Sequence, residues 1–82
     1  MDLLNQARAI INEVDAEMAK LFVRRMRAVE MVAEYKKNNG MPILDEAREG
    51  KLIEQNSRLI EDDTLREYYV PFLRRNMELS RT

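Results

Sequence analysis

The chain has no cysteine and no histidine among its 82 residues, and it contains only two glycines and two prolines. The absence of Cys and His excludes disulfide bonds, thiolate nucleophiles, Ser–His pairs and the usual sets of zinc ligands. Any catalytic chemistry would therefore use carboxylates, lysine, arginine, serine, tyrosine or amide groups.

Neither charge sign dominates, because fourteen basic and fifteen acidic residues give a formal net charge of -1. Such a balance produces no overall field that favours nucleic acid or an anionic membrane. No apolar run approaches the roughly 20 residues of a membrane span, and the first residues lack the basic start and hydrophobic stretch of a signal peptide. We therefore expect a cytoplasmic protein that binds neither nucleic acid nor membranes.

A long amphipathic segment is the main feature that the sequence does contain. Residues 3–37 include neither Gly nor Pro, and their apolar positions recur at intervals of three and four, which predicts one uninterrupted helix. A heptad seam of the kind that a helix buries runs along this segment. The seam consists of Leu4, Ile11, Met18, Arg25 and Val32.

Arg25 occupies a seam position where an apolar side chain is expected. A buried guanidinium is strongly unfavourable unless an anionic group meets it. Asp15 cannot be that group on the same helix, because only residues three or four positions apart meet. The partner is then either a ligand or an acid on another segment or chain, such as Glu13 or Glu17 of a neighbouring helix.

Two shorter helices are predicted after the long one. The segment around Gly40 and Pro42 ends the first helix, and Asp45 is a suitable N-cap for a second helix that runs to about Leu59.

The sequence leaves the start of the third helix open. Asp62 or Asp63 can cap a helix that begins at Thr64 and contains Pro71 as an interior kink. Alternatively, Pro71 can stand in the first turn of a helix that begins at Val70.

The length of the first helix predicts a dimer. The helix is about 50 Å long, whereas a compact globule of this size is only about 30 Å across. Two short helices cannot cover an apolar seam of this length. We therefore expect residues 1–82 to form a single all-α domain of three helices, and two chains to pack their long helices side by side in a six-helix homodimer.

The same helix geometry brings basic residues together. Arg25 and Lys36 lie about 20° from a common face and about 16 Å apart along the axis, so their side chains and a small ligand can fill the gap. Arg8 is about 40 Å from Lys36 on its own helix, so it can join them only from a partner chain. Antiparallel helices that cross near residue 19 would place it there, and symmetry would create two identical sites.

The start of the second helix adds to this constellation, because Asp45, Arg48 and Glu49 share one face of its opening turn. About four basic residues with one or two carboxylates suit a small dicarboxylate that carries a hydroxyl. Arginines bind carboxylates in two-pronged fashion, lysine supplies a point charge, and Glu49 can accept from the hydroxyl.

A series of motifs follows in order along nearly the whole chain. They are Arg8, Asp15, Leu21-Phe22-Val23-Arg24-Arg25, Tyr35-Lys36, Asn39-Gly40-Met41-Pro42-Ile43 and Asp45-Glu46-Ala47-Arg48-Glu49. This set closely resembles the all-helical class of chorismate mutase. The resemblance implies an intertwined helical dimer that rearranges chorismate to prephenate, on the route to phenylalanine and tyrosine, with no metal and no cofactor.

The resemblance also implies roles for the basic residues. Arg8 from the other subunit and Arg25 would bind the substrate carboxylates. Lys36 would donate to the ether oxygen whose bond breaks, and Arg48 would support the charged end of the substrate. Such a rearrangement is unimolecular, so it needs a held conformation and fixed donors rather than a nucleophile.

The remaining implied residues lie at the start of the second helix and near the end of the chain. Glu49 and the backbone around Asp45 would hold the ring hydroxyl. Ser80 matches a family serine that is followed four positions later by a Gln or Glu, the second donor to the ether oxygen. We therefore expect the domain to continue beyond Thr82, and activity to be reduced where that donor is absent. Residues 68–80 also resemble the mutase part of enzymes fused to prephenate dehydratase.

Two alternative functions remain at this point. One is a related lyase on the same fold, which releases pyruvate from isochorismate with the same basic pocket. The other is a non-enzymatic helical dimerisation module, which the seam predicts but which gives no reason for Arg25 to interrupt it.

Overall fold

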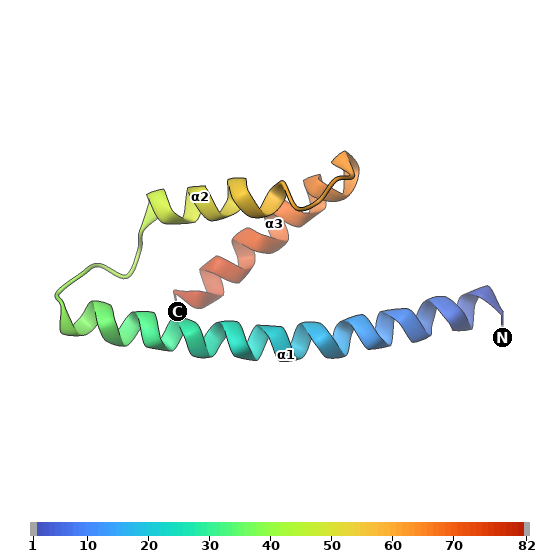
Figure 1. Cartoon of the computed structure of the whole chain (residues 1–82), viewed down its shortest axis with the longest axis horizontal. Helices are drawn as coiled ribbons and strands as arrows, with labels where there is room; N and C mark the ends of the chain where they lie inside the picture. The colour runs from blue at the N-terminus through green and yellow to red at the C-terminus, as the bar shows by residue number, and fades with distance from the viewer. Residues whose placement is uncertain (1, 82) are drawn as a thin grey trace. The chain divides into compact units, whose positions relative to one another are not determined.

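The computed structural model describes residues 2–81, and these form three α-helices. They are α1 (Leu3–Asn38), α2 (Glu46–Ser57) and α3 (Asp63–Ser80), in that order (Figure 1). The chain divides into two compact units, Met1–Glu34 and Tyr35–Thr82, each of which is described by itself. The prediction of an all-α chain with three helices is confirmed.

The long helix α1 ends one residue beyond the segment that the sequence predicted. Its apolar seam is not buried within the single chain, because exposure ranges from 44% for Met18 to 57% for Leu4. The described part of α1 contains no buried residue at all. Residues that heptad spacing marks as a buried face therefore remain an open apolar face on one copy of the chain.

The end of α1 is set by a glycine turn. Gly40 has a positive φ of 62°, and the helix ends two residues before it. The amide of Met41 donates to the Lys36 carbonyl at 2.8 Å, and the Gly40 amide donates to the Lys37 carbonyl at 3.4 Å. This pair of bonds is the Schellman arrangement, which satisfies carbonyls that the helix leaves without partners. The turn therefore places Lys36 in the last turn of α1, next to the loop that follows the helix.

Helix α2 begins where the sequence predicted, with Asp45 as its N-cap. The Asp45 carboxylate accepts from the Arg48 amide at 3.0 Å, which satisfies one of the free amides of the first turn. The helix ends at Ser57, two residues before the predicted end near Leu59, and Arg58 is its C-cap.

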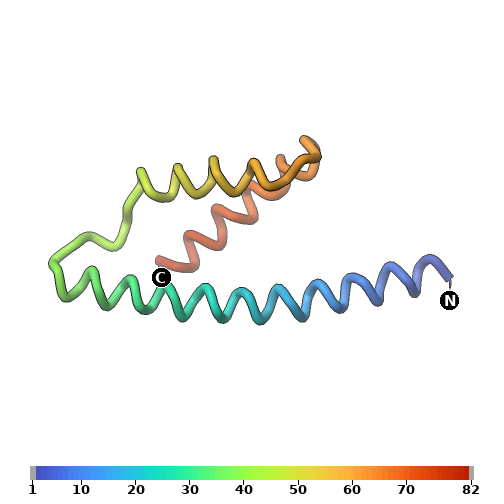
Figure 2. The backbone as a smooth tube through the Cα atoms, in the orientation of Figure 1, coloured from blue at the N-terminus to red at the C-terminus, as the bar shows by residue number. Residues whose placement is uncertain are grey.

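One arginine closes the turn between α2 and α3. The guanidinium of Arg66 donates to the carbonyls of Ser57 at 3.1 Å and Ile60 at 2.6 Å, and it pairs with Asp63 at 2.6 Å. A side chain in the first turn of α3 thus binds the carbonyl of the last residue of α2 and a carbonyl of the turn that follows it. Figure 2 shows the chain reversing at this turn, so that α2 and α3 form a helical hairpin.

Helix α3 settles the choice that the sequence left open. Asp62 is its N-cap and accepts from the amides of Thr64 and Leu65, so the helix begins at Asp63 and Pro71 lies inside it. A start at Val70 is therefore wrong. The strong cap and the contacts with α2 support the helix in spite of the amide that Pro71 lacks.

The buried residues of the described chain lie on α3. Leu73 is 6% exposed and Met77 is 4% exposed, and their spacing of four places them on one helix face. Helix α3 packs against α2, and these two are the buried apolar residues of the hairpin. Within residues 2–81, no helix has both the length and the apolar character that crossing a membrane requires.

We predict that Gly40→Ala lowers the free energy of unfolding by about 1 kcal/mol, because a Cβ is disfavoured at positive φ. A Cβ there would meet nothing within 4 Å, so the loss comes from the backbone alone. Gly50→Ala is the matched control. It also meets nothing within 4 Å and lies inside α2, so it should raise the unfolding free energy by about 0.5–1 kcal/mol. Urea unfolding at one protein concentration measures both, and equal shifts of the same sign would contradict the prediction.

Candidate active site

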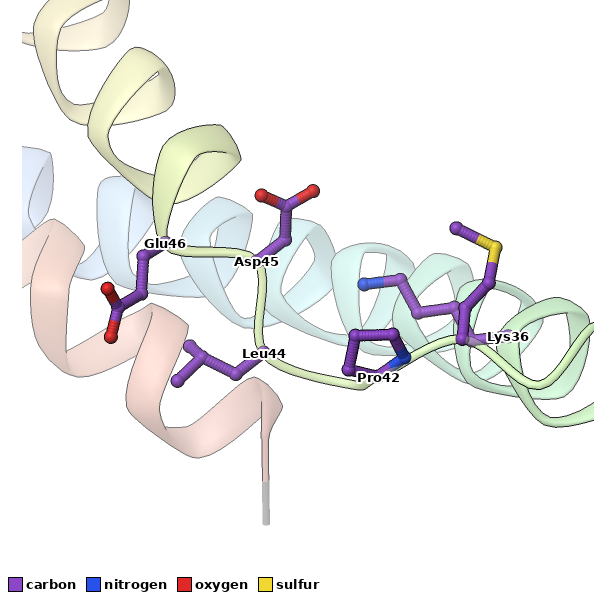
Figure 3. Close-up of a pocket in the computed structure, with 6 residues that line it drawn as sticks. Lys36, Pro42, Leu44, Asp45 and Glu46 are labelled. Atoms are coloured by element: carbon purple, nitrogen blue, oxygen red, sulfur yellow. The ribbon is translucent and has the colours of Figure 1, made fainter.

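A hollow in the second unit lies between the end of α1 and the start of α2. It has a volume of about 460 Å³ and is lined by Lys36, Met41, Pro42, Leu44, Asp45 and Glu46. Figure 3 shows the Lys36 side chain extending from α1 alongside the segment that carries Pro42 and Asp45. Two residues that the sequence predicted for the site, Lys36 and Asp45, therefore line the same hollow.

The Lys36 ammonium is positioned by the loop that it faces. Its Nζ donates to the Ile43 carbonyl at 2.9 Å, and the residue is half-buried. An ammonium carries three protons, so the Lys36 ammonium can donate to a ligand while it stays bonded to the Ile43 carbonyl. The loop therefore holds a positive donor at the edge of the hollow.

Asp45 and Arg48 are linked through the cap of α2. The Asp45 carboxylate accepts from the Arg48 amide, so its first role is structural. The Arg48 residue is exposed. Glu49 lies one residue further along α2, in its first turn, where a carboxylate is favoured by the helix dipole.

The end of α3 returns to the start of α2. The Nε of Arg81, the C-cap residue of α3, lies 3.1 Å from a carboxylate oxygen of Glu49. Ser80, the preceding residue, is half-buried and donates its hydroxyl to the Asn76 carbonyl at 2.8 Å. The hairpin therefore brings the end of α3 to the start of α2, where Arg81 contacts Glu49.

The other two predicted residues lie in the first unit. Arg8 is exposed on α1, whereas Arg25 is half-buried. Among the described residues of that unit, 2–34, only Met26 and Val29 share this intermediate exposure, and all others are exposed. The arginine that interrupts the seam is thus less exposed than the apolar seam residues around it.

Sequence reasoning missed Arg81 and the apolar lining of the hollow. The lining comes from Met41, Pro42 and Leu44, which form the turn rather than a periodic element. Arg81 could have been found from the hairpin, because antiparallel helices place a base at the end of one beside an acid at the start of the other. Which residues of the two helices lie opposite each other depends on the turn between them, and the sequence alone did not specify that turn.

Comparison with known proteins gives a decisive result. The sequence profile of the family described as chorismate mutase type II matches residues 7–82. The chain belongs to the chorismate mutase type II family. The match covers all seven predicted site residues, from Arg8 to Ser80. No curated protein and no solved structure matches the chain.

Membership of the chorismate mutase type II family makes the chain an isomerase that acts on chorismate. This confirms the family, the activity and the substrate that the sequence motifs indicated. Nothing in the comparison favours the pyruvate-releasing lyase or the non-enzymatic dimerisation module.

Proposed function

We propose that this chain rearranges chorismate to prephenate by holding the substrate's conformation and meeting its developing charge, in sites shared by two copies. The observation that carries this proposal is the family match over residues 7–82, which includes the complete set of basic residues. In the reaction one ether C–O bond breaks while one C–C bond forms within the same molecule. Catalysis then needs orientation and electrostatic stabilisation, without a nucleophile.

Lys36 is the proposed donor to the ether oxygen. Negative charge grows on that oxygen as its bond to the ring breaks, and a fixed ammonium stabilises such charge best where water is scarce. The bond from Lys36 to the Ile43 carbonyl supports this role, because it fixes the ammonium beside the hollow before the substrate arrives. Glu49 is the proposed acceptor for the ring hydroxyl, together with the backbone around Asp45.

The arginines are the proposed carboxylate-binding residues. Arg25, Arg8 of a second copy and Arg48 can each present a planar pair of donors to a carboxylate. Ser80 is proposed to lie at the far edge of the site. Its hydroxyl can accept a bond from the ligand while it donates to the Asn76 carbonyl.

A homodimer is proposed because the seam of α1 is apolar and open. The exposed seam residues Leu4, Ile11 and Val32 recur at heptad spacing, which is the pattern of a helix that packs against another helix. A second copy supplies an identical long helix, and an isologous interface would deliver Arg8 to each site. A single domain that continues beyond Thr82, a fused prephenate dehydratase and a cytoplasmic location stay predictions from the sequence.

The activity is tested by incubating the natural protein that contains this chain with chorismate and, separately, with isochorismate. We expect chorismate absorbance to fall as prephenate forms, and we expect no release of pyruvate from either substrate. Pyruvate release from isochorismate would instead support the lyase. Conversion of neither substrate would contradict the proposal and favour the dimerisation module.

Arg25→Ala is expected to lower kcat/KM for chorismate by about 100-fold or more while the dimer persists, because it removes a substrate-binding charge from an otherwise apolar seam. Arg24→Ala is the matched control, since the neighbouring arginine is exposed and lies outside the proposed site. Initial rates and sedimentation velocity measure the two effects. Near-normal turnover by Arg25→Ala would contradict the assignment.

Shared sites predict complementation between inactive subunits. Equal amounts of Arg8→Ala and Arg25→Ala subunits, allowed to exchange, should recover about a quarter of wild-type activity, since half of the dimers are mixed and each has one intact site. Arg25→Ala mixed with Lys36→Met is the control. Arg25 and Lys36 of one chain belong to the same proposed site, so every site in a mixed dimer lacks one of them and no activity should be recovered. Equal recovery in both mixtures would refute the shared site.

A further inference from the structure

The ion pair between Arg81 and Glu49 differs from the surface ion pairs of the chain. Arg58 and Glu54, for example, lie four residues apart on one helix, with side chains 72% and 64% exposed. Arg81 and Glu49 lie on different helices, and their side chains are only 33% and 24% exposed. Partly buried charges are screened less by water and salt than exposed ones. This pair therefore constrains its members more than an ordinary surface pair does.

The ends of the two helices fix the geometry of this pair. Glu49 stands in the first turn of α2, after the Asp45 cap, and Arg81 is the C-cap of α3, with its amide bonded to the carbonyls of Glu78 and Leu79. A carboxylate at a helix N-terminus and a cation at a helix C-terminus are both favoured by the helix dipoles. The dipole of α2 thus stabilises the Glu49 carboxylate, and the dipole of α3 stabilises the Arg81 guanidinium.

The contact also leaves part of Glu49 able to bind a ligand. The Arg81 Nε approaches one oxygen, Oε2, at 3.1 Å. A carboxylate has a second oxygen with its own lone pairs, and that oxygen can accept from a hydroxyl. Without Arg81, the long Glu49 side chain would sample several rotamers, and the ordering of that side chain would have to occur on substrate binding.

We propose that Arg81 is a positioning residue for the reaction, which orients the Glu49 carboxylate toward the hydroxyl of the substrate. This inference rests on the proposed role of Glu49 in holding that hydroxyl. Arg81 acts through Glu49 and does not itself touch the reacting atoms. Its effect on catalysis therefore requires the Glu49 carboxylate.

The test compares variants of Arg81 in the natural protein. Arg81→Met keeps the apolar stem and removes the charge, and it should lower kcat/KM for chorismate by about 10-fold, as the loss of a charge-assisted hydrogen bond does. Arg81→Lys should recover part of that loss. Arg75→Ala is the matched control, because Arg75 lies on α3 and pairs with Glu78, three residues away on the same helix. It should leave kcat/KM unchanged.

A double-mutant cycle with Glu49→Gln separates positioning from a merely structural role. Once the carboxylate is gone, Arg81→Met should cause little further loss of kcat/KM. An undiminished 10-fold loss in the Glu49→Gln background would overturn the inference, since Arg81 would then act on the fold or the substrate directly. A fully active Glu49→Gln would also overturn it, together with the role of Glu49. Wild-type conversion of chorismate in the same assay would show that the activity itself still stands.

Discussion

The length of α1 is the constraint on which the rest of the structure depends. A helix of 36 residues without Gly or Pro cannot fold back on itself. A chain of this size has too little remaining sequence to bury a face that long. The seam is accordingly exposed along the single chain, and the buried residues lie instead in the α2–α3 hairpin. The single chain therefore leaves the apolar face of α1 in contact with solvent.

The turn after α1 places the end of that helix at the hollow of the candidate site. The positive φ of Gly40 ends the helix abruptly, and the following loop returns close enough for Lys36 to bond the Ile43 carbonyl. Asp45 then starts α2 within a few residues. Two local devices, a glycine turn and an aspartate cap, thereby place a lysine, a hollow and a helix N-terminus side by side. The Gly40→Ala and Gly50→Ala comparison measures how much of this arrangement depends on backbone conformation alone.

Local signals were sufficient to predict α1 and the cap of α2, because periodicity, Gly40 and Asp45 act within a few residues of themselves. The start of α3 could not be chosen, since the penalty of Pro71 inside a helix had to be weighed against packing with α2 that the sequence does not display. Arg66 and Arg81 were missed for the same reason. The Ser57 and Ile60 carbonyls that Arg66 binds, and the Glu49 carboxylate that Arg81 binds, become their neighbours only once the hairpin has formed. For the candidate site, residue spacing was enough to propose a group of charged residues, whereas the Arg81–Glu49 ion pair depends on tertiary structure.

The placement of acids along α1 differs between the cations proposed for the site and the surface cations. Lys20 and Arg27 each have a glutamate three residues away and pair with it. Arg8, Arg25 and Lys36 have no Asp or Glu three or four positions away in the sequence. A helix surface that needed only solubility would gain from such acids at each of these positions. At a site for a dianionic substrate the same acids would compete for the guanidinium and ammonium groups, so this placement agrees with the proposed binding role of these three residues. Arg24 shares this absence without belonging to the proposed site, so the criterion alone does not identify a site residue. The adjacent arginines thus differ by helix face, because Arg25 stands in the seam and Arg24 does not.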